Sequence, residues 1–198
     1  MKITALSIEG VFVATSEIWE DSRGSFREWF KKSDLLLANK ETFNVEQANI
    51  SISTKGTIRG IHYSLAPAGQ AKWVTCVSGA VLDVVVDIRP KSKTYKKVEY
   101  INLRAKEGTS VLIGPGLGHG FLANEDGAGV SYLLTSPYSP EHEFDISPMD
   151  LELDIKWSEK SNSEANFLLS PKDLSAPTLS ARQAQGNLPS LRSRQKWI

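Results

Sequence analysis

The chain has 198 residues, of which 40% are hydrophobic, enough to fill one core. Its 23 acidic and 23 basic residues cancel to a formal net charge of zero, which argues against the basic surface of a nucleic-acid-binding protein. The single cysteine cannot form an internal disulfide, and no apolar stretch is long enough to span a bilayer. The N-terminal run lacks a signal peptide's continuous apolar core. We therefore expect one domain over residues 1–198, located in the cytoplasm, with no nucleic-acid or membrane partner.

Short segments rich in Val, Ile, Thr and aromatic residues recur along the chain, and each is bounded by Gly, Pro, Asn or Ser. This pattern is typical of an all-β sandwich or barrel. The predicted strands cover residues 5–14, 25–30, 47–53, 57–63, 71–77, 80–88, 96–103, 110–114, 118–123 and 129–135.

Helix signals are few. The best covers residues 179–186, where Ser180 can cap a helix and Gly186 can end it, and a second short helix is expected over residues 33–40. Neither is long enough to cross over between parallel strands. We therefore expect antiparallel strands closed into a jelly roll that encloses a pocket, with the tail from about residue 158 wrapping the barrel.

Two aspartates interrupt the strand predicted over residues 80–88, which is otherwise apolar enough to be buried on both faces. A buried carboxylate needs a cationic or hydrogen-bonding partner. Asp83 and Asp87 therefore either face a polar cavity or anchor an arginine such as Arg89 or Arg59.

Two of the three histidines lie beside glycines in predicted strands: His62 in RGIHY and His119 in GPGLGHGF. Glycine permits a close backbone approach or a bulge that re-aims a neighbouring side chain. Arg59, Lys72 and Tyr132 also come from predicted barrel strands. Taken singly, each residue has an ordinary structural explanation, but together they would form a pocket suited to an anionic substrate and proton transfer.

A metal site is the obvious alternative, because histidines on barrel strands often hold metal ions. Metal-binding cupins carry a close pair of histidines, whereas here His62 is followed by Tyr63 and Ser64. A closed set of ligands cannot be assembled from these residues, so we expect no metal. The sequence also lacks a G-x-S-x-G nucleophile elbow, a Walker loop and a dinucleotide-binding fingerprint.

The motifs, taken in order, resemble those of the dTDP-4-dehydrorhamnose 3,5-epimerase family. They are DSRGSFREWF, QANISIS, TIRGIHY, AKWVTCVSGAVLDVVVDIR, GLGHGF, SYLLTSPYSPEHEFDI, SPMDLELDIKW and LSPKD. The resemblance covers about residues 9–175. It implies a cupin jelly roll, no metal or organic cofactor, and a homodimer that exchanges an N-terminal strand. The implied reaction inverts C3, C5 or both in a dTDP-4-keto-6-deoxysugar.

The resemblance also implies catalytic roles. His62 of RGIHY matches the general base, and Asp173 of LSPKD matches the carboxylate that orients it. Tyr132 matches the general acid, and Lys72 would stabilise the enolate oxygen. These residue types suit the chemistry, because a proton beside a ketone becomes acidic only as negative charge moves onto the ketone oxygen.

The substrate-binding positions are implied by the same resemblance. One group would hold the nucleotide and its phosphates, a second would reach the partner subunit's pocket, and Tyr138 would stack on thymine. The first group is Arg59, Gln47, Asn49 and Lys172, the second is Arg23, Phe26 and Glu28, and Glu143 and His119 match further binding positions.

Two positions depart from the family pattern. Ser64 follows the His-Tyr pair where glutamine is typical, and Leu133 follows Tyr132 where lysine is common. The sequence also continues beyond LSPKD, as in relatives from modified-deoxysugar pathways. The alternatives are therefore a 3-epimerase, a 3,4-ketoisomerase, a sugar-nucleotide-binding cupin without activity, and a metal-dependent cupin isomerase or dioxygenase.

Overall fold

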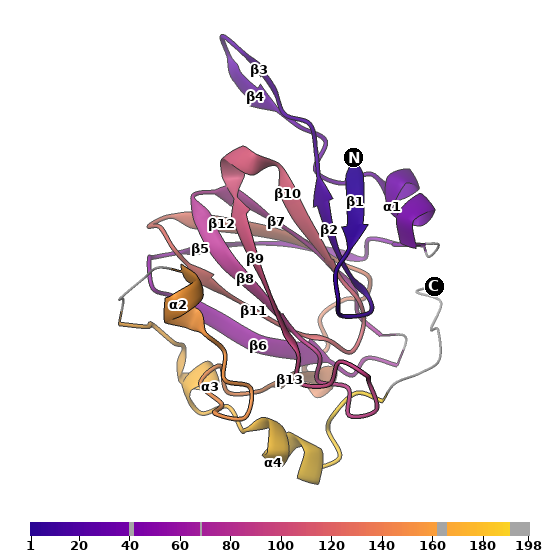
Figure 1. The fold of residues 1–198 in the computed structure, drawn as a ribbon, viewed down its shortest axis with the longest axis vertical. Coiled ribbons are helices and arrows are strands. Elements are labelled where there is room, and N and C mark those ends of the chain that lie inside the picture. The colour runs from indigo at the N-terminus through magenta and orange to yellow at the C-terminus, as the bar shows by residue number, and fades with distance from the viewer. Residues whose placement is uncertain (40–41, 68, 162–165, 191–198) are drawn as a thin grey trace.

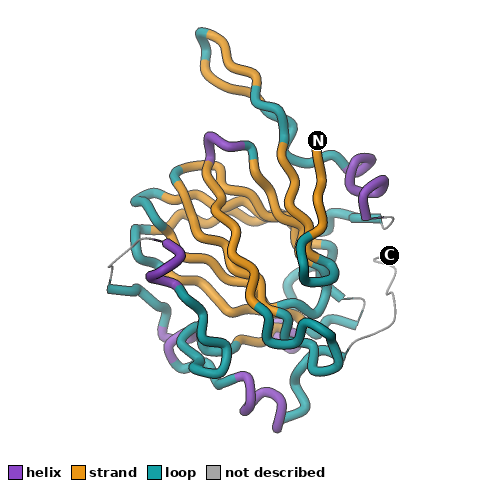
Figure 2. The backbone as a smooth tube through the Cα atoms, in the orientation of Figure 1, coloured by secondary structure: helices purple, strands orange, loops and turns teal. Residues whose placement is uncertain are grey.

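The computed structural model describes residues 1–39, 42–67, 69–161 and 166–190. Two antiparallel sheets, one of six strands and one of five, form the body of the molecule (Figures 1 and 2). The six-stranded sheet has the order β1-β2-β10-β7-β12-β5. Its strands are β1 (Lys2–Ala5), β2 (Val11–Thr15), β10 (Thr109–Ile113), β7 (Lys72–Ser78), β12 (Ala128–Leu134) and β5 (Gln47–Ser53).

The five-stranded sheet has the order β13-β6-β11-β8-β9. Its strands are β13 (Glu143–Asp145), β6 (Ile58–Ser64), β11 (Gly118–Ala123), β8 (Ala80–Val86) and β9 (Val98–Arg104). A separate hairpin of β3 (Trp19–Asp21) and β4 (Gly24–Phe26) extends away from the body (Figure 1). The helices are α1 (Lys32–Asn39), α2 (Trp157–Ser161), α3 (Pro171–Leu174) and α4 (Leu179–Ala184), with 3-10 turns η1 (Ala105–Glu107) and η2 (Pro140–His142).

The predicted all-β jelly roll with a few short helices is confirmed, with corrections at its edges. The segment predicted as one strand over residues 5–14 is divided, because residues 6–10 turn between β1 and β2. The strand predicted over residues 25–30 ends at Phe26, and the guanidinium of Arg27 then bonds the Thr75 hydroxyl. Thr178, not Ser180, caps α4, accepting a hydrogen bond from the Ala181 amide at 3.2 Å.

Apolar side chains fill the space between the sheets and also cover the outer face of the five-stranded sheet. The interior cluster includes Val74, Val85 and Val111, all fully buried. Leu82, Val84 and Val86 of β8 point to the other side, where Trp157 of α2 and Leu179 of α4 cover them. β8 is therefore buried on both faces, as its apolar run predicts, and the C-terminal helices pack on the sheet that carries His62.

Glycines allow β6 and β11 to approach closely beside the predicted histidines. Gly60 has φ +127°, and a Cβ there would lie 2.6 Å from the Cα of Gly120. The β11–β6 register shifts between His119 and Phe121. This irregularity interrupts the alternation of β6, so that Arg59 and His62 line one cavity, while Ile61 packs in the outer cluster. Both features that glycine permits, a close backbone approach and an irregular register, are therefore present beside the histidines.

No helix in the described ranges is both long and apolar enough to cross a lipid bilayer.

Candidate active site

A cavity of about 480 Å³ opens between the two sheets and has the size of a small-ligand site. It receives side chains from both sheets and from the segment that leads into α3. It brings together seven of the fourteen residues that the sequence predicted for the site. These seven are Arg59, His62, Lys72, His119, Tyr132, Lys172 and Asp173, and the other lining residues are Ser51, Thr54, Thr57, Ile58, Phe121, Leu168, Leu169 and Ser170.

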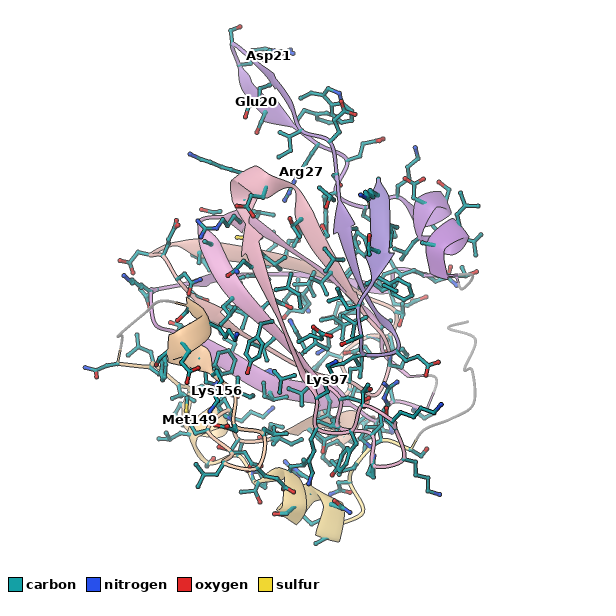
Figure 3. All side chains as sticks on the ribbon, in the orientation of Figure 1. Glu20, Asp21, Arg27, Lys97, Met149 and Lys156 are labelled. Atoms are coloured by element: carbon teal, nitrogen blue, oxygen red, sulfur yellow. The ribbon has the colours of Figure 1, made fainter. Side chains whose placement is uncertain are left out.

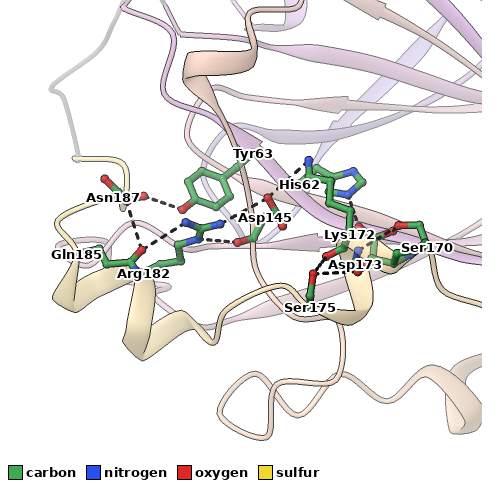
Figure 4. A network of polar contacts seen from close by, with 11 residues as sticks. His62, Tyr63, Asp145, Ser170, Lys172, Asp173, Ser175, Arg182, Gln185 and Asn187 are labelled. Carbon is green, nitrogen blue, oxygen red and sulfur yellow. Dashed lines mark hydrogen bonds and ion pairs between the residues drawn. The ribbon is translucent and has the colours of Figure 1, made fainter.

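His62 and Asp173 form a hydrogen-bonded pair on one side of this cavity (Figure 4). Nε2 of His62 lies 2.6 Å from Oδ1 of Asp173, although 111 residues separate them in the chain. The Ser170 hydroxyl donates to the second carboxylate oxygen at 2.9 Å and also caps α3 by accepting from the Asp173 amide. Asp173 is therefore fixed by its helix cap as well as by the imidazole.

The carboxylate of Asp173 stays ionised despite being buried. Burial acts to raise its pKa, but the hydrogen bonds and charge interactions from His62 and the bond from Ser170 outweigh burial and hold the pKa below its usual value. An ionised carboxylate only accepts hydrogen bonds, so the His62 ring nitrogen facing it donates. The other ring nitrogen is then left as the proton acceptor.

A second histidine–carboxylate pair lies deeper in the barrel. Nε2 of His119 is 2.8 Å from Oδ2 of Asp83, which is fully buried. His119 lies directly opposite His62 in the β11–β6 pairing. Asp83 fits neither of its two predicted roles, because it does not line the cavity and its partner is a histidine rather than an arginine. Asp87 instead anchors Arg89, whose Nε lies 2.8 Å from the carboxylate.

The six-stranded sheet supplies the opposite wall. Lys72 comes from β7, Tyr132 from the adjacent β12, and Ser51 from β5. Tyr132 pairs with Val74 on one side and with Asn49 on the other. The imidazole of His62 and the phenol of Tyr132 therefore reach the same cavity from different sheets.

Lys72 is the buried cation of this wall, with 9% of the residue exposed. Burial lowers the pKa of its ammonium, while the charges of Glu143 and Asp83 act in the opposite direction. Among the described residues no carboxylate forms an ion pair with it. An ammonium in this state can donate to an oxygen of a ligand.

Seven predicted binding residues lie outside the lining of the cavity, and four of them belong to the barrel body and its loops. Gln47 and Asn49 share the face of β5 that carries Ser51, and Gln47 donates to Asn49 at 2.9 Å. The Tyr138 amide donates to the Gln47 side chain at 2.7 Å, which places Tyr138 beside the start of β5. Glu143, on β13, accepts a hydrogen bond from Gln70 at 3.3 Å. These contacts form two separate polar groups outside the cavity lining, one at the start of β5 and one on β13.

The structure does not bring Arg23, Phe26 and Glu28 to the cavity. Arg23 and Phe26 lie on the projecting hairpin, where Arg23 contacts Asp21 at 2.5 Å. Figure 3 shows Glu20 and Asp21 near the tip of this hairpin, far from the barrel body. Glu28 follows the hairpin, and its carbonyl accepts a bond from the Ser16 hydroxyl.

Within the described part of the chain, no group of three or more His, Cys, Asp or Glu residues could hold a metal ion. The two cavity histidines are each engaged by one aspartate. The donor set available to a ligand is therefore imidazole, phenol, ammonium and guanidinium, which suits proton transfer and anion binding.

Sequence reasoning did not find Ser170, Leu168 and Leu169 as cavity residues. Leu168 forms a parallel bridge with Thr57, the residue before β6, which brings the segment before α3 to the cavity. The signal for Ser170 was present, because a serine three residues before an acidic residue is typical of a helix cap. The bridge has no comparable sequence signal.

Comparisons with known proteins identify the family of the chain. The sequence model of the dTDP-4-dehydrorhamnose 3,5-epimerase family matches residues 5–181. A dTDP-4-dehydrorhamnose 3,5-epimerase of Mycolicibacterium smegmatis is 40% identical over 198 residues, which cover 100% of this chain and 96% of that protein.

Two solved structures are similar over nearly the whole chain. One is a 4-keto-6-deoxy sugar epimerase from the novobiocin biosynthetic gene cluster of Streptomyces spheroides, with a TM-score of 0.91, 40% identity and coverage of 96% of this chain and 94% of that one. The other is a 3'-monoepimerase from Streptomyces bikiniensis in complex with dTDP-quinovose, with a TM-score of 0.88, 40% identity and coverage of 93% and 91%.

The fold, the cavity and these similarities define a carbohydrate epimerase of the cupin type, an enzyme of the isomerase class. The extent of the matches makes the assignment more specific. The chain belongs to the dTDP-4-dehydrorhamnose 3,5-epimerase family.

Proposed function

We propose that the enzyme inverts C3, C5 or both in a dTDP-4-keto-6-deoxyhexose, by removing a proton beside the ketone and returning one to the opposite face. The observation that carries this proposal is the placement of His62 and Tyr132 on different sheets around one cavity. Inversion needs two proton-transfer groups that approach one carbon from opposite sides, and two facing sheets can provide them.

His62 is the general base in this mechanism. Asp173 fixes the tautomer of the imidazole and stabilises the imidazolium that forms when the ring takes a proton. Lys72, with His119 nearby, stabilises the negative charge that develops on the ketone oxygen. Burial strengthens this interaction, because little water competes for the ammonium.

The remaining predicted residues bind the nucleotide part of the substrate. Arg59 and Lys172 supply positive charge to the cavity for the diphosphate. Gln47, Asn49 and Glu143 extend the polar wall beside the cavity, and the exposed ring of Tyr138 stacks on thymine.

The test uses a dTDP-4-keto-6-deoxyglucose in deuterated water, followed by NMR. The wild-type enzyme should incorporate deuterium at C3, C5 or both, with inversion. Deuterium at C3 alone would identify a 3-epimerase, the activity in the name of the dTDP-quinovose-bound relative. Movement of the carbonyl signal to another carbon would identify a ketoisomerase. Absence of deuterium from both carbons would contradict the proposal.

Tyr132→Phe should separate the two proton transfers. We expect inversion to slow by about a hundred-fold, because the phenol that returns the proton is gone. Exchange with solvent at the same carbon should continue with retention, because His62 can still remove and return a proton on its own face. The same NMR spectra measure both quantities.

Tyr95→Phe is the matched control, because the Tyr95 hydroxyl bonds Gln183 outside the cavity. It should behave as wild type. If Tyr132→Phe left inversion unchanged, the phenol would not be the acid.

We further propose a homodimer in which the hairpin of one subunit completes the cavity of the other. The hairpin projects from its own barrel, with 45% of Trp19 and 66% of Phe26 exposed. The two rings contact each other, with centroids 5.8 Å apart. Two exposed aromatic rings on an arm that barely touches its own subunit are better explained by burial against a partner.

Complementation between two inactive variants tests this arrangement. Arg23→Ala and His62→Asn should each be nearly inactive, but a refolded equal mixture should recover about a quarter of the wild-type activity. In each mixed dimer, one site combines an intact cavity with an intact hairpin. Activity of the mixture after refolding is the measurement.

A mixture of His62→Asn with Tyr132→Phe is the control. Both residues line the cavity of one subunit, so a mixed dimer contains no intact site and should recover no activity. Equal recovery in the two mixtures, or none with Arg23→Ala, would contradict the exchanged hairpin. Light scattering checks that the wild-type protein and the variants are dimers.

A further inference from the structure

The chain beyond Asp173 is attached to the strand next to His62. Arg182 of α4 donates from Nε to the backbone carbonyl of Asp145 at 2.8 Å, and its second nitrogen lies 3.5 Å from the Asp145 carboxylate. The guanidinium also lies over the ring of Phe144, 5.3 Å from the centroid. The side chains of Arg182 and Asp145 are only 13% and 11% exposed, so solvent screens this contact weakly.

Tyr63, the residue after His62, joins the same group. Its ring is fully buried and stacks on Phe144 at 5.7 Å, and its hydroxyl donates to the carbonyl of Asn187 at 2.6 Å. Burial raises the pKa of this hydroxyl, so it remains a donor. We call these five residues, Tyr63, Phe144, Asp145, Arg182 and Asn187, the C-terminal latch.

The Asp145 carboxylate also reaches α3, which carries Asp173. Nζ of Lys172 lies 3.6 Å from the same oxygen that contacts Arg182 (Figure 4). Asp145 is in turn the cross-strand partner of His62 in the β13–β6 pairing. Asp145 therefore connects three elements. Its strand pairs with β6, which carries His62, and its carboxylate contacts both α3, which carries Asp173, and α4, which carries Arg182.

A helix of four residues has almost no stability of its own, so the position of α3 depends on its tertiary contacts. The His62–Asp173 contact is short and directional, and a shift of α3 would lengthen it. We propose that Asp145 and Arg182 are positioning residues, which hold α3 so that Asp173 stays aligned with His62. The catalytic part of this inference rests on the proposed function, whereas the alignment itself can be measured without substrate.

Arg182→Met tests the latch, because methionine keeps much of the apolar contact with Phe144 and removes the charge and the donors. We expect kcat to fall by about ten-fold or more, because small misplacements of catalytic groups are costly. KM should stay within about three-fold, since Arg182 does not line the cavity. Arg182→Lys should recover part of kcat by restoring a cation near Asp145.

The second readout is the downfield proton NMR signal of the His62 ring N–H in the substrate-free protein, assigned by its loss in Asp173→Asn. Arg182→Met should broaden this signal or remove it. The corresponding signal of His119, bonded to Asp83, should remain and serves as an internal reference. Gln183→Ala is the matched control on the same helix, since its contact is with Tyr95, and it should leave kcat and both signals unchanged.

If Arg182→Met keeps kcat and the His62 signal while its melting temperature falls, the latch is only structural and the proposal is wrong. If Arg182→Met does not fold, Asp145→Asn carries the test by the same two criteria. It removes the charge but keeps the backbone carbonyl that accepts from Arg182. If the wild-type protein shows no epimerisation, the proposed function fails, but the NMR comparison still decides whether the latch aligns Asp173.

Discussion

His62→Asn is expected to lower kcat by roughly a thousand-fold or more, because it removes the group that takes the substrate proton. Deuterium incorporation at C3 and C5 should disappear together with inversion, since both depend on the first proton transfer. Asparagine is shorter than histidine and does not reach Asp173, which bonds Nε2 of His62, but the Ser170 hydroxyl still holds this carboxylate, so the cavity should keep its shape. Steady-state kinetics and NMR in deuterated water measure these effects.

The affinity for dTDP distinguishes loss of chemistry from loss of binding. Isothermal calorimetry should give a dissociation constant for His62→Asn within a few-fold of the wild-type value, because the base acts on the sugar ring. His142→Asn is the matched control. His142 bonds Ser139 at 2.8 Å and does not line the cavity, so this variant should behave as wild type.

Two results would contradict the role of His62. One is a variant that retains a tenth or more of the wild-type kcat, because a general base contributes about a hundred-fold at least. The other is that the wild-type protein and His62→Asn bind dTDP-sugars with the same affinity and neither protein converts the substrate. That result would indicate a binding protein.

The sequence was informative where local rules decide the structure. RGIHY and GLGHGF place glycines beside histidines, and the structure has a close approach of Gly60 to Gly120 with a register shift there. The alternation of residues 47–53 separates a polar from an apolar face of β5, but the expectation that the polar face lies outward in water, as is usual for such a strand, was wrong, because Ile50 and Ile52 are the exposed residues. Such patterns depend on neighbours along the chain and can be recognised without coordinates.

Contacts between segments that are distant in the chain could not be predicted from the sequence. β13 has three residues, too few for an alternating pattern, and it becomes a strand because β6 offers a free edge. The role of Asp145 depends on that strand and on Arg182, 37 residues further on. Asp173 was associated with His62 through family resemblance, since no spacing rule joins residues 111 positions apart.

Lys72→Met is expected to lower kcat by about a hundred-fold or more, because it removes the donor to the developing enolate oxygen. The same substitution should stabilise the fold at neutral pH. Burial lowers the pKa of Lys72, which means that the folded protein disfavours the charged ammonium relative to the unfolded chain. Methionine fills similar volume without that cost.

The pH dependence follows from the sign of this shift. Between the lowered pKa of folded Lys72 and the ordinary value, the unfolded chain binds more protons, so wild-type stability rises with pH in that window. The advantage of Lys72→Met should therefore shrink as the pH approaches about 10.5, the ordinary pKa of lysine. Urea unfolding of both proteins at pH 7 and at higher pH measures the difference.

Lys97→Met is the matched control, because Lys97 is exposed on the loop between β8 and β9 and lies outside the cavity lining (Figure 3). It should alter neither kcat nor the pH dependence of stability. If Lys72→Met unfolds at lower urea than wild type at every pH, the ammonium stabilises the substrate-free fold and the argument from burial is wrong. If Lys72→Met instead unfolds at higher urea than wild type and has a lower kcat, the ammonium of Lys72 contributes to catalysis at a cost in stability. An apolar side chain at this position would make the fold more stable.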